Sequence, residues 1–279
     1  MNSMAKSESS ARIVTSVVAV ISAAALAVSL IAAGFAACAV PDVSTKALAS
    51  VYSTDGASPF TKDELVAAAV QTKHYTIDDN DKAAVYATIA AINAQEALAG
   101  TAGKGAPKID ATANYAAGEL SGEQIAALEA AFDAASERYV LTPDAVSHLD
   151  DVFGVVQAAK WWLLAAVVAA CVGCTATAFR GGKRLLGRVL AGAGVSVLAV
   201  FALLAAWVAI DFDGFFAQFH SLFFAAGTWT FSWDSLLICM YPPEFWVGMG
   251  AIWLVVTVAC CVVCITIGRL LRKGSTQKR

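Results

Sequence analysis

Four long apolar runs, separated by polar segments, dominate the pattern of this 279-residue chain. They cover residues 13–40, 161–179, 189–210 and 245–268, and none of them contains a charged residue. A helix of about 20 apolar residues spans the roughly 30 Å hydrocarbon core of a bilayer. The pattern therefore predicts an integral membrane protein with four transmembrane helices.

Composition supports this class and excludes others. Apolar residues make up 58% of the chain and charged residues only 15%, whereas soluble domains carry roughly 45–50% and 25%. The formal net charge is -3, so the chain lacks the basic excess of a nucleic-acid-binding protein. We expect no nucleic acid among its partners.

The charges that flank the runs predict the orientation. Eleven of the 19 basic residues, but only one of the 22 acidic residues, lie in segments 1–12, 180–188 and 269–279. The positive-inside rule places these three segments in the cytoplasm and residues 41–160 and 211–244 outside. A competing interpretation of the N-terminus is a cleavable signal sequence, because Ala36-Ala37-Cys38 resembles a processing site, but the apolar run is longer than a usual signal core.

The external region 41–160 carries helix signals and few strand signals. Thr61 and Glu64 form a capping-box pattern before a helix to about residue 72, and Ser121 begins another helix that runs to about Arg138. An Ala-rich helix is expected over 83–98. Pro143 stands at a favoured first helical position, and one helix from there is expected to continue through the second span.

These signals predict an all-α membrane protein with four transmembrane helices and an extracytoplasmic α-helical cap. The predicted segments are a cytoplasmic tail 1–12, a first span 13–40, a cap 41–160, a second span 161–179, a cytoplasmic loop 180–188, a third span 189–210, an external aromatic segment 211–244, a fourth span 245–268 and a cytoplasmic tail 269–279.

Aromatic residues are concentrated between Trp207 and Trp246, where 13 of the 27 in the chain occur. An interfacial belt of Trp and Tyr is the ordinary explanation. Phe is the commonest aromatic residue here, however, and we interpret the segment as the wall of an apolar pocket that also lies at the interface.

Two of the three histidines have informative neighbours. His148 precedes Asp151 by three residues, which places both on one helix face, where a carboxylate could orient the imidazole. His220 lies within the aromatic segment. His74 reads as a solvated surface residue.

The sequence resembles the lipoprotein intramolecular transacylases (Lit) and related integral membrane proteins. The resemblance rests on His148, Asp151 and Val152 before the second span, and on a later set that consists of Phe219-His220-Ser221-Leu222-Phe223-Phe224, Gly227, Trp229, Phe231, Asp234 and Tyr241-Pro242. It implies a bacterial cell-membrane enzyme that moves the sn-2 acyl chain of a diacylglyceryl-modified lipoprotein to the α-amino group of the same cysteine.

Chemistry agrees with that implication. An α-amino group with a pKa near 7.7–8.0 is mostly protonated at neutral pH and needs a base, and imidazole can accept and later return a proton. We therefore expect His148 and His220, with Asp151, to be catalytic. The substrate-binding residues are expected to be Phe219, Phe223, Phe224, Trp229, Phe231, Asp234 and Tyr241.

No metal or cofactor is expected. Cys171 and Cys174, and Cys260, Cys261 and Cys264, have metal-like spacing but lie inside predicted spans, where small residues commonly fill helix contacts. Besides its lipoprotein substrate, the protein should contact membrane lipids, and the sequence leaves its oligomeric state open. The alternative function is a non-catalytic membrane protein whose cap binds a partner or a lipid.

Overall fold

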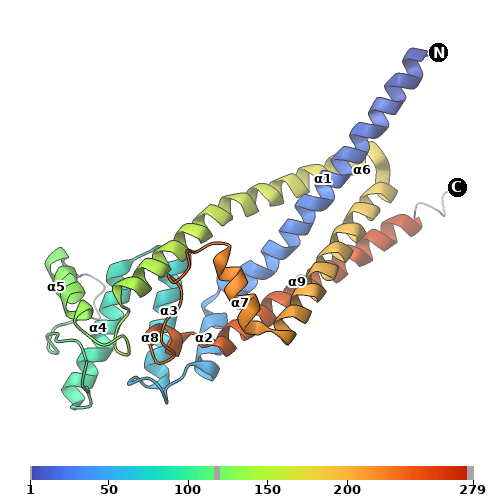
Figure 1. The fold of residues 1–279 in the computed structure, drawn as a ribbon. Helices are drawn as coiled ribbons and strands as arrows, with labels where there is room; N and C mark the ends of the chain where they lie inside the picture. Colours follow the sequence, from blue (N-terminus) through green and yellow to red (C-terminus); the bar gives the residue numbers. More distant parts are fainter. Residues whose placement is uncertain (1, 116–119, 275–279) are drawn as a thin grey trace. The chain divides into compact units, whose positions relative to one another are not determined.

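The computed structural model describes residues 2–115 and 120–274, which form helices joined by turns and contain no strand (Figure 1). The predicted all-helical fold is confirmed for these residues. The helices are α1 (Asn2–Ala39), α2 (Asp42–Tyr52), α3 (Lys62–Ile77), α4 (Lys82–Ala99), α5 (Gly122–Asp133), α6 (Pro143–Ile210), α7 (Phe212–Ser221), α8 (Leu236–Met240) and α9 (Pro243–Gly274).

The chain divides into two compact units. The first, here the helical bundle, contains Met1–Ala37, Ala158–Phe215 and Ala251–Arg279. The second, here the cap unit, contains Cys38–Gln157 and Phe216–Gly250. The bundle holds the apolar runs, and the cap unit holds both histidines of the predicted site.

Three helices are long and apolar enough to cross a membrane, namely α1, α6 and α9. Helix α6 has 68 residues and contains two of the predicted spans, 161–179 and 189–210. The chain leaves helical geometry at Gly182, where φ is 72° and ψ is -179°, and Figure 1 shows α6 turning back on itself. The predicted loop 180–188 is thus helical apart from this glycine, whose positive φ an L side chain would disfavour.

Small residues let the helices of the bundle approach closely. A Cβ on Gly34 of α1 would lie 2.8 Å from the carbonyl oxygen of Trp253 on α9, and one on Gly187 of α6 would lie 2.5 Å from that of Gly268 on α9. Membrane helices pack in this way because apolar side chains gain little by leaving lipid. Large apolar side chains such as Phe179 are correspondingly exposed on the outer surface of the bundle.

The cap unit follows the capping signals of its sequence. The predicted capping box of Thr61 and Glu64 is present at the start of α3, and Ser121 and Gln124 form a second one at the predicted start of α5. They satisfy backbone donors that a helix start otherwise leaves unpaired. Apolar side chains from α3, α4, α5, α6 and α8 then share one core, whose largest fully buried members include Phe60, Leu65, Phe132 and Met240.

Some helix boundaries differ from the predictions. Helix α5 ends at Asp133 rather than near Arg138, because the chain then turns and the backbone N–H of Ser136 donates to the carbonyl of Gly105 at 2.8 Å. Helices α2, α7 and α8 were not predicted. The expected continuity from Pro143 through residue 179 is confirmed.

Candidate functional site

Helix α7 fixes the orientation of His220. Its Nδ1 lies 2.8 Å from the carbonyl oxygen of Phe216, one helical turn earlier. A carbonyl oxygen only accepts, so Nδ1 carries the proton, and in the neutral ring Nε2 keeps its lone pair. The helix therefore presents His220 with one defined acceptor nitrogen.

Aromatic rings enclose the His220 imidazole. The centroid of the His220 ring lies 4.0 Å from that of Phe216 and 4.9 Å from that of Trp229, with interplanar angles of 36° and 31°. Phe224 and Phe219 follow at 5.7 and 5.8 Å. Trp229 and Phe224 come from the segment after α7, which therefore folds back over the ring.

His148, near the start of α6, lies beside the same rings. Its centroid is 4.8 Å from Phe224, 5.7 Å from Phe231 and 6.3 Å from His220. The side chain is only 8% exposed, and its buried Nδ1 has no hydrogen-bond partner. The structure thus brings the two predicted histidines together within one unit, with Phe224 in contact with both.

Burial lowers the pKa of both histidines. For His148 the pKa falls to about 4, chiefly by desolvation and further by the nearby His220 charge, and Asp151 opposes the shift. Desolvation also lowers the pKa of His220, against the hydrogen bond to Phe216. Both rings are therefore neutral at pH 7, and protonation of one disfavours protonation of the other.

Asp151 makes a weaker connection to His148 than its spacing indicated. It is exposed and forms no hydrogen bond with His148, so its effect is a distant charge. Its neighbour Asp150 instead accepts hydrogen bonds from the Tyr75 hydroxyl and, at 3.1 Å, from Asn80 Nδ2. Asp150, which the sequence did not single out, ties the first turns of α6 to the end of α3.

The other predicted substrate-binding residues divide into two groups. Phe219 and Phe223 make an edge-to-face contact with their ring centroids 5.3 Å apart, and they are 42% and 48% exposed, so they form the exposed edge of the aromatic cluster. Asp234 and Tyr241 have other partners: Asp234 pairs with Arg138 at 3.5 Å, and the buried Tyr241 hydroxyl donates to the carbonyl of Ala69. These two residues anchor the segment and do not contact either imidazole.

Phe216 and the indole nitrogen of Trp229 are features of the site that the sequence motifs did not reveal. Phe216 supplies both a ring and a carbonyl to His220, and its position four residues earlier on a helix is the signal that could have identified it. The Nε1 of Trp229 is buried without a hydrogen-bond partner. An unpaired buried donor of this kind lowers the stability of the fold by about 1–3 kcal/mol. Because neither Trp229 Nε1 nor His148 Nδ1 has a partner, both keep unused hydrogen-bonding capacity at the site.

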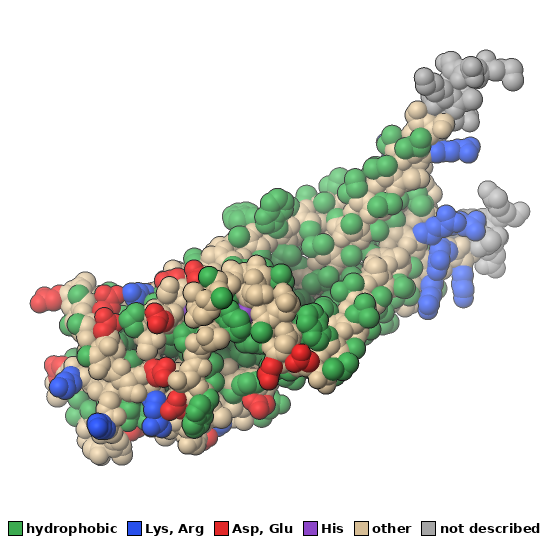
Figure 2. All heavy atoms as spheres, viewed as in Figure 1, with side chains coloured by type: hydrophobic (Ala, Val, Ile, Leu, Met, Phe, Trp, Pro, Cys, Tyr) green, Lys and Arg blue, Asp and Glu red, His purple; other side chains and the backbone are tan. Residues whose placement is uncertain are grey.

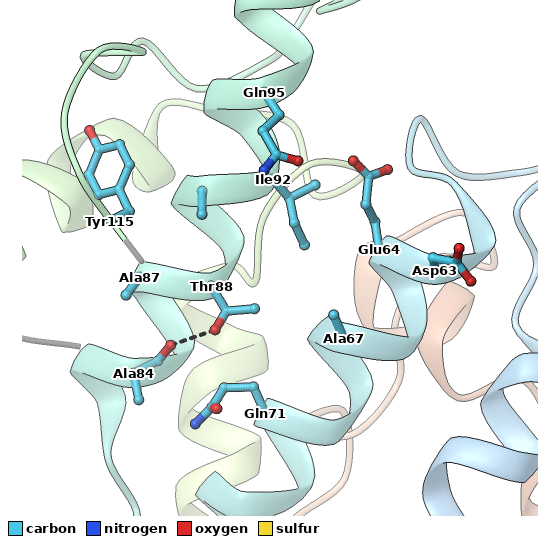
Figure 3. A pocket seen from close by; sticks show the side chains of 11 residues that line it. Asp63, Glu64, Ala67, Gln71, Ala84, Ala87, Thr88, Ile92, Gln95 and Tyr115 are labelled. Atoms are coloured by element: carbon cyan, nitrogen blue, oxygen red, sulfur yellow. Dashed lines mark hydrogen bonds between the residues drawn. The ribbon is translucent and has the colours of Figure 1, made fainter. Parts of the chain in front are cut away.

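A separate cavity lies between α3 and α4, and Figure 3 shows Ala67 and Gln71 of α3 facing Ala84 and Thr88 of α4 across it. Its volume is about 510 Å³, and none of the predicted site residues lines it. The apolar pocket expected from the aromatic segment stays a prediction, and what the structure shows there is a set of packed rings around the two histidines.

In the described part of the chain, no three His, Cys, Asp or Glu side chains are grouped so that they could hold a metal ion. The five cysteines with metal-like spacing form no disulfide in the part of the chain that the structure describes.

Comparisons with known proteins point to one family. Its model, described as lipoprotein intramolecular transacylase Lit, matches residues 113–246, which include both histidines. A structure of the membrane integral lipoprotein intramolecular transacylase Lit from Bacillus cereus is 15% identical, with a TM-score of 0.62 over 95% of this chain and 98% of that chain. The structure of a variant of that protein, with one histidine replaced by alanine, gives a TM-score of 0.64. The match covers 99% of this chain and 100% of the variant chain, also at 15% identity. No curated protein sequence matches the chain.

The lowered pKa of His148 predicts a specific acid sensitivity. The unfolded chain binds a proton on this residue near pH 6.5 and the folded chain only near pH 4, so folding stability is complete above pH 6.5 and declines as the pH falls toward 4. His148→Gln should flatten this decline in apparent Tm, measured by thermal unfolding of the detergent-solubilised protein. Above pH 7, the change of apparent Tm with pH should be nearly the same in the wild-type protein and in the variant. Equal changes in the two proteins between pH 4 and 6.5 would contradict the lowered pKa of His148.

Proposed function

We propose that the protein is a membrane acyltransferase of the lipoprotein intramolecular transacylase family, Lit, whose model matches residues 113–246. It moves the sn-2 acyl chain of a diacylglyceryl-modified lipoprotein to the α-amino group of the same N-terminal cysteine and yields the lyso-form. The observation that carries the proposal is the pair of neutral imidazoles, the buried His148 and the half-buried His220, whose ring centroids lie 6.3 Å apart inside the matched segment.

The reaction joins two parts of one molecule. The neutral α-amino nitrogen attacks the acyl carbon, the new N–C bond forms, and the ester C–O bond breaks to leave a free glyceryl hydroxyl. The transition state closes a ring of eight atoms, so catalysis depends on holding the substrate in a folded conformer. Rigid aromatic walls such as Phe219, Phe223 and Phe224 suit that task because they exclude water and restrict the lipid.

The two histidines divide the proton transfers. The Nε2 of His220, whose acceptor character follows from the Nδ1–Phe216 hydrogen bond, takes the proton that the amine loses. The proton then passes by way of His148 to the leaving glyceryl oxygen, so one proton moves and none is consumed. Only one of the two rings carries this proton at a time, because a second positive charge is disfavoured there.

Trp229 is the donor that we assign to the acyl carbonyl. Negative charge develops on this oxygen during attack, and a buried, pre-positioned N–H stabilises such charge strongly. The indole Nε1 is buried, has no partner in the cap unit and belongs to a ring that lies 4.9 Å from His220. Asp151 modulates the charge of His148 from the exposed side of α6.

We also propose four membrane spans with both termini in the cytoplasm and an extracytoplasmic cap. The turn at Gly182 separates two apolar helical segments of α6, each about as long as a bilayer is thick. Residues 41–160 and 211–244 then lie outside, where the histidine pair meets lipoproteins of the outer leaflet of a bacterial cell membrane. Residues 275–279 of the predicted C-terminal tail lie outside the described part of the chain.

Replacement of either histidine tests the function. His148→Ala and His220→Ala should each lower lyso-form production by about 10²–10⁴-fold, the usual loss when a general acid–base group is removed. The measurement is mass spectrometry of the N-terminus of a reporter lipoprotein. The matched control is His74→Ala, which replaces the third histidine of the chain and should retain activity. Asp151→Asn should lower activity less than either replacement in the histidine pair. Full activity in both variants of the pair would refute the acid–base assignment.

The role of Trp229 separates catalysis from stability. Trp229→Phe keeps an aromatic ring beside His220 and removes only the N–H, so activity should fall about 10²-fold while the Tm stays the same or rises. Trp246→Phe is the matched control, because its Nε1 donates to the carbonyl of Tyr241 at 3.1 Å. This second variant should lose stability and keep activity. The reverse pattern would show that Trp229 has a structural role only.

The topology is tested by labelling engineered cysteines in intact cells with a membrane-impermeant maleimide. Ala102→Cys, at an exposed position between α4 and α5, should be labelled without permeabilisation, because residues 41–160 are placed outside. Lys183→Cys, an exposed position just after the turn in α6, should be labelled only after permeabilisation. Labelling of both sites in intact cells would rule out the four-span arrangement.

A further inference from the structure

A second candidate binding site lies in the helical bundle, at the turn of α6 and the end of α9. A cavity of about 330 Å³ is lined by five residues, and every one is basic: Arg184, Arg188, Arg269, Arg272 and Lys273. Figure 2 shows basic side chains gathered together at this end of the bundle. Orientation by positive charge requires basic residues near the membrane surface, but it does not require them to converge on one cavity.

The convergence follows from the helix packing. Gly187 and Gly268 bring α6 and α9 so close that a Cβ on Gly268 would lie 2.6 Å from the carbonyl oxygen of Gly187. Arg184 and Arg188 share one face of α6 because they are four residues apart, and Arg269, Arg272 and Lys273 share one face of α9 for the same reason. Contact between the two glycines therefore turns two basic stripes toward one space.

The chemistry of the lining identifies the ligand class. Several positive charges around one cavity produce a strong positive potential. A guanidinium group can also donate two parallel hydrogen bonds to two oxygens of one phosphate group. The cavity lies near the lower end of the volume range of small-ligand sites, about 300–1,000 Å³, which suits a headgroup rather than a larger molecule. An anionic phosphate group fits both the charge and the size.

The surroundings favour a phosphate that is attached to acyl chains. Leu270, next to Arg269 on α9, is 63% exposed, and Ile267 on the preceding turn is 45% exposed. An amphipathic ligand with its phosphate in the cavity could lay its chains along such apolar surface. We propose that this cavity binds the headgroup of an anionic phospholipid, in a site distinct from the histidine pair and independent of the proposed reaction.

The test measures lipid binding to the full chain in detergent by native mass spectrometry. The probes are dioleoylphosphatidylglycerol, dioleoylphosphatidylcholine with the same chains, and inorganic phosphate. Phosphatidylglycerol should bind at least tenfold more tightly than phosphatidylcholine. Arg184→Gln together with Arg188→Gln should weaken it about 25-fold, since each cation near an anionic lipid contributes about fivefold.

Two matched variants make the result interpretable. Lys104→Gln with Lys108→Gln removes the same charge from exposed positions of the cap unit and should change affinity less than twofold. Arg184→Lys with Arg188→Lys keeps the charge, should retain most of the affinity, and reports on folding. Equal affinity for the two lipids would overturn the lipid site. So would an equal loss of affinity in the Lys104→Gln, Lys108→Gln control. The third contradicting result is that inorganic phosphate binds as tightly as phosphatidylglycerol and displaces it at millimolar concentration.

Discussion

Desolvation keeps the imidazoles of His148 and His220 neutral, and the arrangement around them depends on this condition. Two charged rings 6.3 Å apart would repel each other, and aromatic neighbours offer neither ring a counter-ion. Among the described residues, the hydrogen-bonded partner of the pair is the carbonyl of Phe216, which anchors His220. In the proposed reaction, such a pair would exchange a single proton with the substrate and would hold no charge between turnovers.

The cap unit holds the pair by contacts that lie outside the aromatic shell. Asp150 links the start of α6 to Tyr75 and Asn80, and Asp234 links the segment after α7 to Arg138. The backbone adds a further connection, since the N–H of Leu236 donates to the carbonyl of Glu137 at 2.7 Å. His148 and His220 reach the site from elements far apart in the sequence, so these ties determine how accurately the two rings face each other. Charge pairs that are half exposed contribute little stability, and their value here is positional.

Local signals explain why much of this structure could be predicted from sequence. Long apolar runs, capping boxes at Thr61 and Ser121, and Pro143 at a helix start each act over a few residues, and they gave the helices α3, α5 and α6. Helix α2 escaped prediction because Pro41 at its N-cap provides no side-chain hydrogen bond. Spacing placed Asp151 on the face of His148, but the tertiary partners of the site belong to Asp150, one residue earlier. No periodicity reveals such partners, because they come from α3 and the turn after it.

The reversal at Gly182 has a consequence for assembly. A single non-helical residue joins the two halves of α6, so almost no chain entropy is lost when one half folds back on the other. The residues on either side of the turn therefore become neighbours as soon as they are synthesised, and contacts that are local in sequence form fastest. The close approach of Gly187 on α6 to Gly268 on α9 can form only later, after the aromatic segment 211–244 has been made. Biogenesis of the bundle therefore has a built-in order, with the turn in α6 first and the contact with α9 last.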